Sequence, residues 1–268
     1  MPVPESLFFQ GSSWGCIYYI HCYVAMLEKY GESLYDAKMG GNSSGALIAL
    51  AIKLRASPAK LLAVYEQLAK RSRVEGVWGR MSIYHSEALA ALMPNGDEYK
   101  QLNGELFIGI TRFFKRHELI SRWNSQQELI DTMHASFHIP LYCSYIAKVN
   151  GQFAIDGVFS STSSMLCTNT VSIGWACVGK TIHPNEALID VSFIKPFSDA
   201  EVEARKDKWN HTNICECIAH KSNRQKAYSR SVLVLVWGLR FVESLNSTRK
   251  RLVKYIACIY SLILRYMF

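Results

Sequence analysis

The stretch GGNSSGAL at residues 40 to 47 contains the pattern Gly-x-Ser-x-Gly, in which Ser43 lies between Gly41 and Gly45. Between a strand and a helix, this pattern holds a serine hydroxyl out of a tight turn, and the glycines leave room where strand and helix approach. The N-terminus of the following helix favours negative charge that develops beside the serine. Because a helix-capping Gly/Ser loop has the same local composition, other residues must decide between a nucleophile and a structural turn.

A carboxylate further along the chain is a candidate base for this serine. FAIDGVFSS at 153–161 predicts an apolar strand that ends at Asp156, followed by Gly157. A carboxylate within hydrogen-bond reach can accept a proton from a serine without an imidazole. The competing interpretation is an ordinary Asp-Gly β-turn.

A third segment could supply backbone donors. FFQGSSWGC at 8–16 predicts a strand, a loop and the start of a helix. The N–H groups of Gly11, Ser12 and Ser13 in such a loop could form an oxyanion hole.

The sequence also allows other chemistry. His138, in SFHIP, is the nearest candidate for the histidine of a Ser-Asp-His triad, although a lone histidine before Ile-Pro is more often structural. Cys16 and Cys22 fall on different faces of one predicted helix, so we expect them to be packing residues. The segment HTNICECIAH could bind zinc, but its Cys-x-Cys spacing is uncommon in structural zinc sites, so we predict no metal. Its candidate ligands are His211, Cys215, Cys217 and His220.

Hydrophobic periodicity predicts the elements that must position these residues. The predicted strands are SLFFQ (6–10), LYDAKMG (34–40), ELFIGITRF (105–113), YCSYIAKV (142–149), FAID (153–156), VSIGWACV (171–178) and LIDVSFI (188–194). The predicted helices are 14–30, 44–54, 57–72, about 84–93 and 125–137. Alternating strands and helices favour a mainly parallel sheet with helices on both faces, that is, a three-layer α/β/α sandwich.

With these elements in order, the chain resembles the patatin-like phospholipase family. The resemblance covers roughly residues 5–165 and is carried by the loop at 10–16, the pattern around Ser43 and the Asp156-Gly157 pair. It extends to LNGELFIGITRF (102–113), ELIDTMHAS (128–136) and HIPLY (138–142).

The resemblance implies a metal-free and cofactor-free serine hydrolase that cleaves acyl esters of glycerolipids, of the phospholipase A or acylglycerol lipase type. It implies that Ser43 is the nucleophile and Asp156 the general base and acid. Gly11, Ser12 and Ser13 would line the oxyanion hole, and an acyl-enzyme would pass to water or, in a transacylase, to another acceptor. The family's loop is usually richer in glycine, and Val158 follows Gly157 where the family has Gly or Ala. These departures keep open a second hypothesis, a catalytically weak lipid-surface binding protein on the same scaffold.

Charge and hydrophobicity separate the C-terminal quarter of the chain from the rest. Residues 1–200 carry 17 basic and 17 acidic residues, whereas residues 201–268 carry 13 and 5. We expect an acyl hydrolase domain at 5–200 and a basic, partly apolar and mainly helical segment at 201–268. Apolar runs at 231–239 and 255–264 flank TRKRLVK, which favours a lipid surface over nucleic acid. Peripheral membrane or lipid-droplet binding is expected, with a tail anchor at 252–268 as the alternative.

The remaining composition indicates an intracellular protein. No Lys or Arg precedes Lys29, so we expect no secretory signal. The eight cysteines show no repeated spacing, which favours reduced thiols over a disulfide scaffold.

Overall fold

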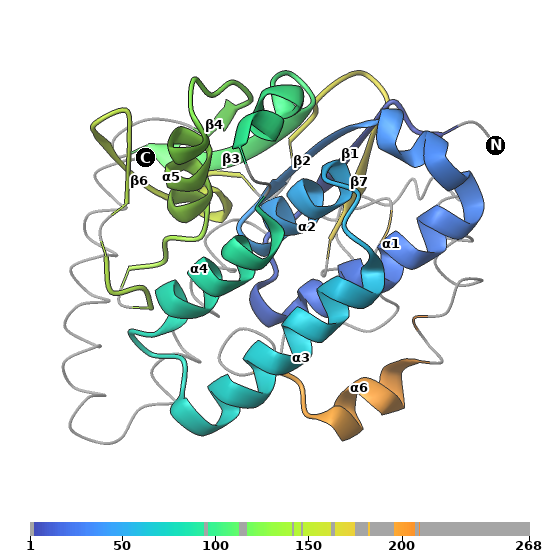
Figure 1. The fold of residues 1–268 in the computed structure, drawn as a ribbon, viewed down its shortest axis with the longest axis vertical. Helices are drawn as coiled ribbons and strands as arrows, with labels where there is room; N and C mark the ends of the chain where they lie inside the picture. The colour runs from blue at the N-terminus through green and yellow to red at the C-terminus, as the bar shows by residue number, and fades with distance from the viewer. Residues whose placement is uncertain are drawn as a thin grey trace. The chain divides into compact units, whose positions relative to one another are not determined.

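A mostly parallel sheet lies at the centre of the structure (Figure 1). The computed structural model describes residues 3–93, 96–112, 117–140, 142–145, 147–161, 164–174, 182, 196–206 and 209, which belong to one compact unit. The described strands are β1 (Ser6–Phe9), β2 (Lys38–Asn42), β3 (Leu106–Arg112), β4 (His117–Ile120), β5 (Lys148–Val149), β6 (Gln152–Asp156) and β7 (Thr170–Ile173). They form a seven-stranded sheet in the order β5-β6-β3-β2-β1-β7, with β4 paired to β3.

The direction of each strand divides the sheet into two parts. β7, β1, β2 and β3 run parallel to one another, whereas β4, β5 and β6 pair antiparallel with their neighbours. All four residues of β1 are buried, as expected for an apolar strand in the middle of a parallel sheet.

Strand β3 has three partners on its two edges, and this arrangement creates the site. β2 pairs with β3 as far as Gly109, β4 pairs with Ile108 to Thr111, and β6 pairs with Ile110 to Arg112. Some residues of β3 pair with both β4 and β2, and others pair with both β4 and β6. Since one residue has one partner on each edge, β2 and β6 must both lie on the edge of β3 opposite to β4. β6 therefore continues along the edge where β2 stops, and the ends of β2 and β6 meet.

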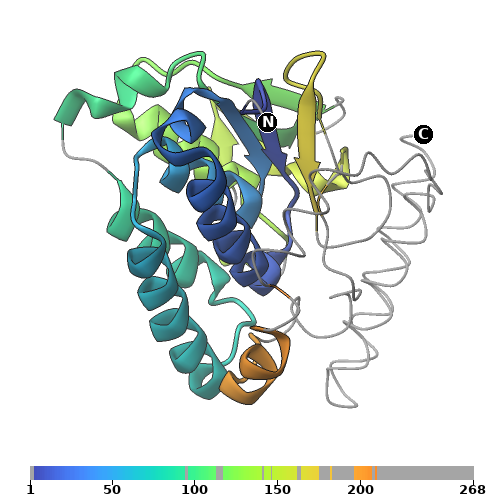
Figure 2. The same ribbon diagram turned by 90° about the vertical axis from the view of Figure 1, so that its right-hand side faces the viewer.

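The described α-helices lie on one side of this sheet, except α6, which lies beside the end of α3 (Figure 2). They are α1 (Cys16–Tyr30), α2 (Ser44–Lys53), α3 (Pro58–Glu75), α4 (Met81–Leu92), α5 (Gln126–Ser136) and α6 (Asp199–Lys206). Short 3₁₀ helices occur at η1 (Ser13–Gly15), η2 (Gly31–Asp36), η3 (Gly96–Leu102) and η4 (Gly157–Phe159). The first two crossovers, β1 to β2 and β2 to β3, proceed in the same direction across the sheet. Since such connections are right-handed, they place their helices on the same face.

The fold class predicted from the sequence is confirmed. The chain is a mixed α/β protein with a mostly parallel central sheet, consistent with a three-layer α/β/α sandwich. The described residues supply the sheet and one helical layer. Predicted helix boundaries also hold: the Ser57 side chain caps α3 by accepting from the Lys60 N–H, and Gly31, with φ of 56°, ends α1.

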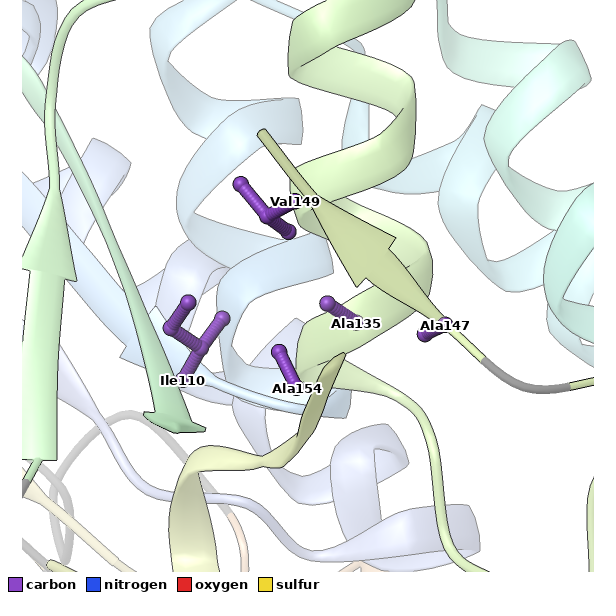
Figure 3. Packing of buried hydrophobic residues seen from close by; sticks show 5 residues of the cluster. All are labelled: Ile110, Ala135, Ala147, Val149 and Ala154. Carbon is purple, nitrogen blue, oxygen red and sulfur yellow. The ribbon is translucent and has the colours of Figure 1, made fainter. Parts of the chain in front are cut away.

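Small side chains allow α5 to approach the antiparallel part of the sheet (Figure 3). Ala135 of α5 packs with Ile110 of β3, Val149 of β5 and Ala154 of β6, together with Ala147. Alanines on both sides shorten the distance between helix and sheet. The C-terminal end of α5 consequently lies against β3 and β6, beside the end of β2.

Two predicted strands are corrected. Residues 34–36 belong to the 3₁₀ helix η2, and β2 begins only at Lys38, because the positive φ of Gly31 turns the chain into a tight helical turn first. Of the residues described between 142 and 149, only Lys148 and Val149 form a strand. Tyr142 and Cys143 both donate their N–H groups to the Ile139 carbonyl, which makes a turn after Pro140.

Other expectations are incompletely covered by the structure. Strand β4, with the short and half-polar sequence HELI, is not predicted by hydrophobic periodicity. β7 confirms the first part of the strand predicted at 171–178. α6 includes the first residues of the segment predicted at 201–268, and the helical character of that segment stays a prediction. Several predictions concern residues that the structure does not describe: the strand residues 175–178 and 188–194, the zinc candidates at 211–220 and the anchor at 252–268. The domain boundary near 200 also stays a prediction. None of the helices that the structure describes has the length and apolar character needed to cross a bilayer.

Lys53, at the end of α2, ties this helix to the strands on either side of it. Its Nζ donates to the carbonyls of Tyr35 and Ala37, which precede β2, at 2.9 and 3.2 Å. It also pairs at 3.0 Å with the carboxylate of Glu105, which precedes β3. The Lys53 side chain is 8% exposed and that of Glu105 is 41% exposed. The two backbone bonds are therefore the buried part of this contact.

We expect Lys53→Met to lower the free energy of unfolding by about 2–3 kcal/mol, because two buried carbonyls lose a charged donor. Glu105→Gln should cost less than about 1 kcal/mol, because its carboxylate is partly solvated. Chemical denaturation of both variants measures the difference. An equal loss in both variants would show that the ion pair, and not the backbone bonds, fixes α2.

Candidate active site

The predicted turn around Ser43 connects a strand to a helix, as the pattern requires. β2 ends at Asn42 and α2 begins at Ser44, so Ser43 alone forms the connection. Its backbone has φ of 54° and ψ of −134°, a conformation that a residue with a side chain rarely adopts. The Ser43 N–H donates to the Ser136 hydroxyl at 2.8 Å. Ser43 is therefore held in a strained conformation at the N-terminus of a helix.

The two glycines of the pattern are required by close backbone approach. A Cβ on Gly41 would collide with the carbonyl carbon of Gly45. A Cβ on Gly45 would collide with the carbonyl of Phe9, at the end of β1. Neither position has room for a side chain, which agrees with the reason inferred from the sequence.

Asp156 is the last residue of β6 and lies beside Ser43. Its side chain accepts a 2.9 Å hydrogen bond from the Val158 N–H at Oδ1, and the Ser43 hydroxyl lies close enough to interact with the carboxyl and lower its pKa. Its own N–H donates to the His138 carbonyl at 2.9 Å. Asp156 is 1% exposed, so both its backbone and its side chain are fixed in a buried position.

The environment of Asp156 changes its acidity. Burial raises the pKa of the carboxyl to about 7, while the hydrogen bonds from Ser43 and Val158 act in the opposite direction. A carboxyl with a pKa near 7 can accept a proton at neutral pH and return it in a later step. Paired with a serine on a strained turn, it has the properties needed for nucleophilic catalysis.

The N-terminal loop lies against the same turn. A Cβ on Gly11 would lie 3.0 Å from the Ser43 Cβ, so Gly11 closely faces the serine. Both the N–H and the hydroxyl of Ser12 lie 3.1 Å from the Ser44 Oγ. Ser13 has φ of 50° and begins η1.

This geometry refines the expected oxyanion donors. The three N–H groups at 11–13 were expected to point together at a substrate oxygen, but the Ser12 N–H donates to Ser44 instead. Ser12 is fully buried, so this bond is shielded from solvent. The loop brings Gly11 to the site, while Ser12 anchors the loop on α2.

Two site residues were not found from the sequence. Ser136, the last residue of α5, accepts from the Ser43 N–H and donates to the Gly109 carbonyl of β3, both at 2.8 Å. A Cβ on Gly109 would collide with the Asn42 side chain, and a Cβ on Gly157 would lie 2.5 Å from the Gly109 carbonyl oxygen. No local pattern marks Ser136 or Gly109. The sequence indicates them only by position: Gly109 lies in the strand, and Ser136 ends the helix, that come before Asp156 in the chain.

The described histidines do not complete a triad. His138 contributes its backbone carbonyl to Asp156, and its ring lies 5.5 Å from the Tyr145 ring, measured between centroids. In the described ranges, none of the imidazole rings of the five histidines (His21, His85, His117, His134 and His138) hydrogen-bonds to Ser43 or to the Asp156 carboxyl.

The described residues hold no group of three or more His, Cys, Asp or Glu side chains that could bind a metal ion. Cys16 and Cys22 are both free thiols, in agreement with their predicted role in packing. Burial raises the pKa of the Cys16 thiol to about 12, so it is not a thiolate at neutral pH.

Comparison with known proteins gives one distant relative. No protein-family model matches the chain. Over 166 residues, the chain is 28% identical to the omega-hydroxyceramide transacylase of Mus musculus, an alignment that covers 59% of this chain. It covers only 28% of that protein's length. The likeness to an acyl-transferring lipid enzyme supports lipid ester chemistry in general for this chain.

Proposed function

We propose that the protein is a lipid acyl hydrolase that cleaves carboxylic esters of glycerolipids through a Ser43–Asp156 dyad and an acyl-enzyme. The observation that carries this proposal is a serine on a strained strand–helix turn whose hydroxyl interacts with the buried Asp156 carboxyl, and burial raises the pKa of that carboxyl to about 7. The resemblance to patatin-like phospholipases and the likeness to a lipid transacylase agree in the class of bond attacked. The proposal needs no metal and no cofactor.

The proposed reaction has two halves. The Ser43 oxygen attacks the ester carbonyl while Asp156 accepts its proton, and a tetrahedral oxyanion forms. The oxyanion collapses, the bond to the alcohol breaks, and Asp156 returns the proton to the leaving alcohol. Water then gives a proton to Asp156 and attacks the acyl-serine carbonyl to form a second tetrahedral oxyanion. As this collapses, the bond to the Ser43 oxygen breaks, Asp156 returns the proton to Ser43, and the fatty acid is released. An alcohol in place of water would make the same site a transacylase.

The oxyanion needs donors that are not already engaged. We assign this role to the Ser13 N–H of the loop and to the Ser44 N–H at the first turn of α2, where the helix dipole favours negative charge. Gly11 lets the loop lie closely against Ser43 and Val158, because a side chain at this position would collide with Val158. Ser12 would serve the hole indirectly, by holding the loop through Ser44.

The substrate class suggests where the enzyme works. Glycerolipids lie in bilayers and lipid droplets, and the basic, apolar segment 201–268 has the composition of an interfacial binding segment. We propose an intracellular enzyme with peripheral attachment through this segment, with a tail anchor at 252–268 as the alternative.

Two other functions remain distinguishable by experiment. An α/β-hydrolase with a Ser-Asp-His triad would need an imidazole beside the Asp156 carboxyl. His138 contacts Asp156 through its backbone carbonyl, which accepts the Asp156 N–H. A lipid-surface binding protein on the same scaffold would keep the fold without turnover. The anchoring of Ser12 on Ser44 favours the enzyme, because the loop is held beside the serine and not displaced from it.

We expect Ser43→Ala and Asp156→Asn each to reduce lipid hydrolysis at least about 10³-fold, because the two side chains act as one unit. Wild type and variants are compared on a panel of phospholipids and acylglycerols, with released fatty acids measured by mass spectrometry. A fluorophosphonate probe should label wild type at Ser43 and leave Ser43→Ala unlabelled.

Ser33→Ala and Asp131→Asn are matched controls, since Ser33 bonds only to the Tyr30 carbonyl and Asp131 lies on the outside of α5. Both should keep wild-type activity. Retained hydrolysis in Ser43→Ala or Asp156→Asn would contradict the dyad. Folded wild type that shows neither turnover nor labelling would favour the binding protein, and loss of activity on replacing His138 alone, with retained folding, would favour the triad.

The pH dependence should follow the ionisation of Asp156. Its carboxylate is the proton acceptor, so kcat/KM should be half-maximal near pH 7 and fall about tenfold per pH unit below it. An uncharged acylglycerol or thioester substrate restricts the titration to the enzyme. A profile that stays flat from pH 8 to pH 5 would rule out Asp156 as the base.

The ionisation of Asp156 that increases activity as the pH rises should decrease the stability of the fold. Because burial raises the folded pKa above the unfolded value, the neutral carboxyl stabilises the fold. This contribution is complete below about pH 4 and is lost as the pH rises through about 7. Between pH 5 and pH 8, wild type should therefore lose more unfolding free energy than Asp156→Asn. Equal losses would show that Asp156 has an ordinary pKa.

A further inference from the structure

The hydroxyl of Ser136 is the contact through which α5 reaches the turn at Ser43. Ser136 is fully buried, and its oxygen lies 2.8 Å from both the Ser43 N–H nitrogen and the Gly109 carbonyl oxygen. A hydroxyl has one proton, which it gives to the carbonyl, so its lone pair must accept the Ser43 N–H. This single side chain satisfies two buried backbone groups.

The turn itself explains why Ser43 needs such a partner. With φ of 54°, Ser43 leaves the ladder between β2 and β3, so its N–H has no carbonyl of the sheet to donate to. A non-glycine residue in this conformation persists only when its surroundings hold it there. The contact with Ser136 is the hydrogen bond that the backbone N–H of Ser43 makes.

The chain immediately after α5 also holds Asp156. The His138 carbonyl accepts the Asp156 N–H at 2.9 Å, and His138 follows Ser136 by only two residues. One turn of chain therefore contacts the backbone of both proposed catalytic residues. The close packing of Ala135 against Ile110 and Ala154 fixes this turn relative to the sheet (Figure 3).

We propose that Ser136 is a positioning residue, whose hydroxyl holds the Ser43 backbone in the conformation that places the Ser43 oxygen against Asp156. The inference rests on the proposed function, in which Ser43 is the nucleophile. Without the Ser136 hydroxyl, the turn at Ser43 relaxes toward an ordinary backbone conformation. The Ser43 oxygen then leaves Asp156, although neither reacting side chain has been altered.

The test replaces Ser136 by alanine in the full chain and compares it with a control on the same helix. Thr132 is also fully buried on α5, and its hydroxyl accepts from the Trp123 Nε1–H at 3.0 Å and donates to the Glu128 carbonyl at 2.7 Å. Thr132→Val therefore removes a buried hydroxyl of α5 that does not touch the dyad. Both variants should be destabilised, so stability alone does not distinguish them.

Three measurements distinguish positioning from structural support. Ser136→Ala should lower kcat roughly 10- to 100-fold with KM unchanged, because small displacements of reacting atoms have effects of this size. Labelling of Ser43 by a fluorophosphonate should slow by the same factor. The midpoint of the pH profile should rise above that of wild type, because Asp156 loses the Ser43 hydrogen bond that lowers its pKa. Thr132→Val should leave all three unchanged.

A second variant keeps the test decisive if Ser136→Ala does not fold. Ser136→Cys keeps the shape with a weaker donor and acceptor, so it should give an intermediate loss of kcat and a smaller rise of the pH midpoint. Wild-type kcat and pH midpoint in a folded Ser136→Ala or Ser136→Cys protein would overturn the positioning role and leave the proposed function intact. Absence of turnover and labelling in folded wild type would instead overturn the proposed function itself, and the inference with it.

Discussion

The sharing of β3 by three strands is the constraint on which the site depends. A strand has two edges, and β4 occupies one edge of β3. β2 and β6 each pair with residues of β3 that β4 also pairs with, so both must use the other edge. β6 must therefore follow β2 along the remaining edge, with its direction reversed. The antiparallel pairing places Asp156 opposite Ile110, one residue beyond the Gly109 that pairs with Asn42. The carboxyl thus comes to the end of β2, where the chain turns at Ser43.

This meeting point is energetically unfavourable in isolation, and the surrounding structure compensates for it. A serine with positive φ costs on the order of 1–3 kcal/mol, and burial opposes the ionisation of Asp156. The compensation comes from backbone groups that find partners: Ser43 at Ser136, Asp156 at His138, and Val158 at the Asp156 carboxyl. The glycines at 41, 45 and 109 allow these strands and helices to come close enough for those bonds. Strain and burial are concentrated where reactivity would be useful, as is common at functional sites.

Ser12 of the N-terminal loop has a structural role, because it binds the loop to Ser44 of α2. Ser12 replaces a glycine of the resembled family, yet it fits a fully buried position because its N–H and hydroxyl both meet Ser44. Ser44 is the variable residue that follows Ser43 in the pattern. The loop and the turn are therefore joined by a pair of serines, and the substitution ties the loop to α2 instead of loosening it. The number of N–H groups that remain for a substrate is correspondingly smaller.

The sequence by itself determined the periodic helices, the parallel strands β1, β2 and β3, and the candidates Ser43 and Asp156, because periodicity, caps and the Gly-x-Ser-x-Gly spacing are local signals. It failed at 34–36 and at 142–143, where turn hydrogen bonds outweighed apolar composition, and at β4, a short strand that pairs with an edge of β3. Only the tertiary structure decided that Ser43 and Asp156 meet, that Ser136 holds the turn and that Ser12 binds Ser44. Each of these contacts joins residues more than 30 positions apart. Such contacts depend on which strand occupies which edge and on how closely α5 packs, and no local pattern encodes either.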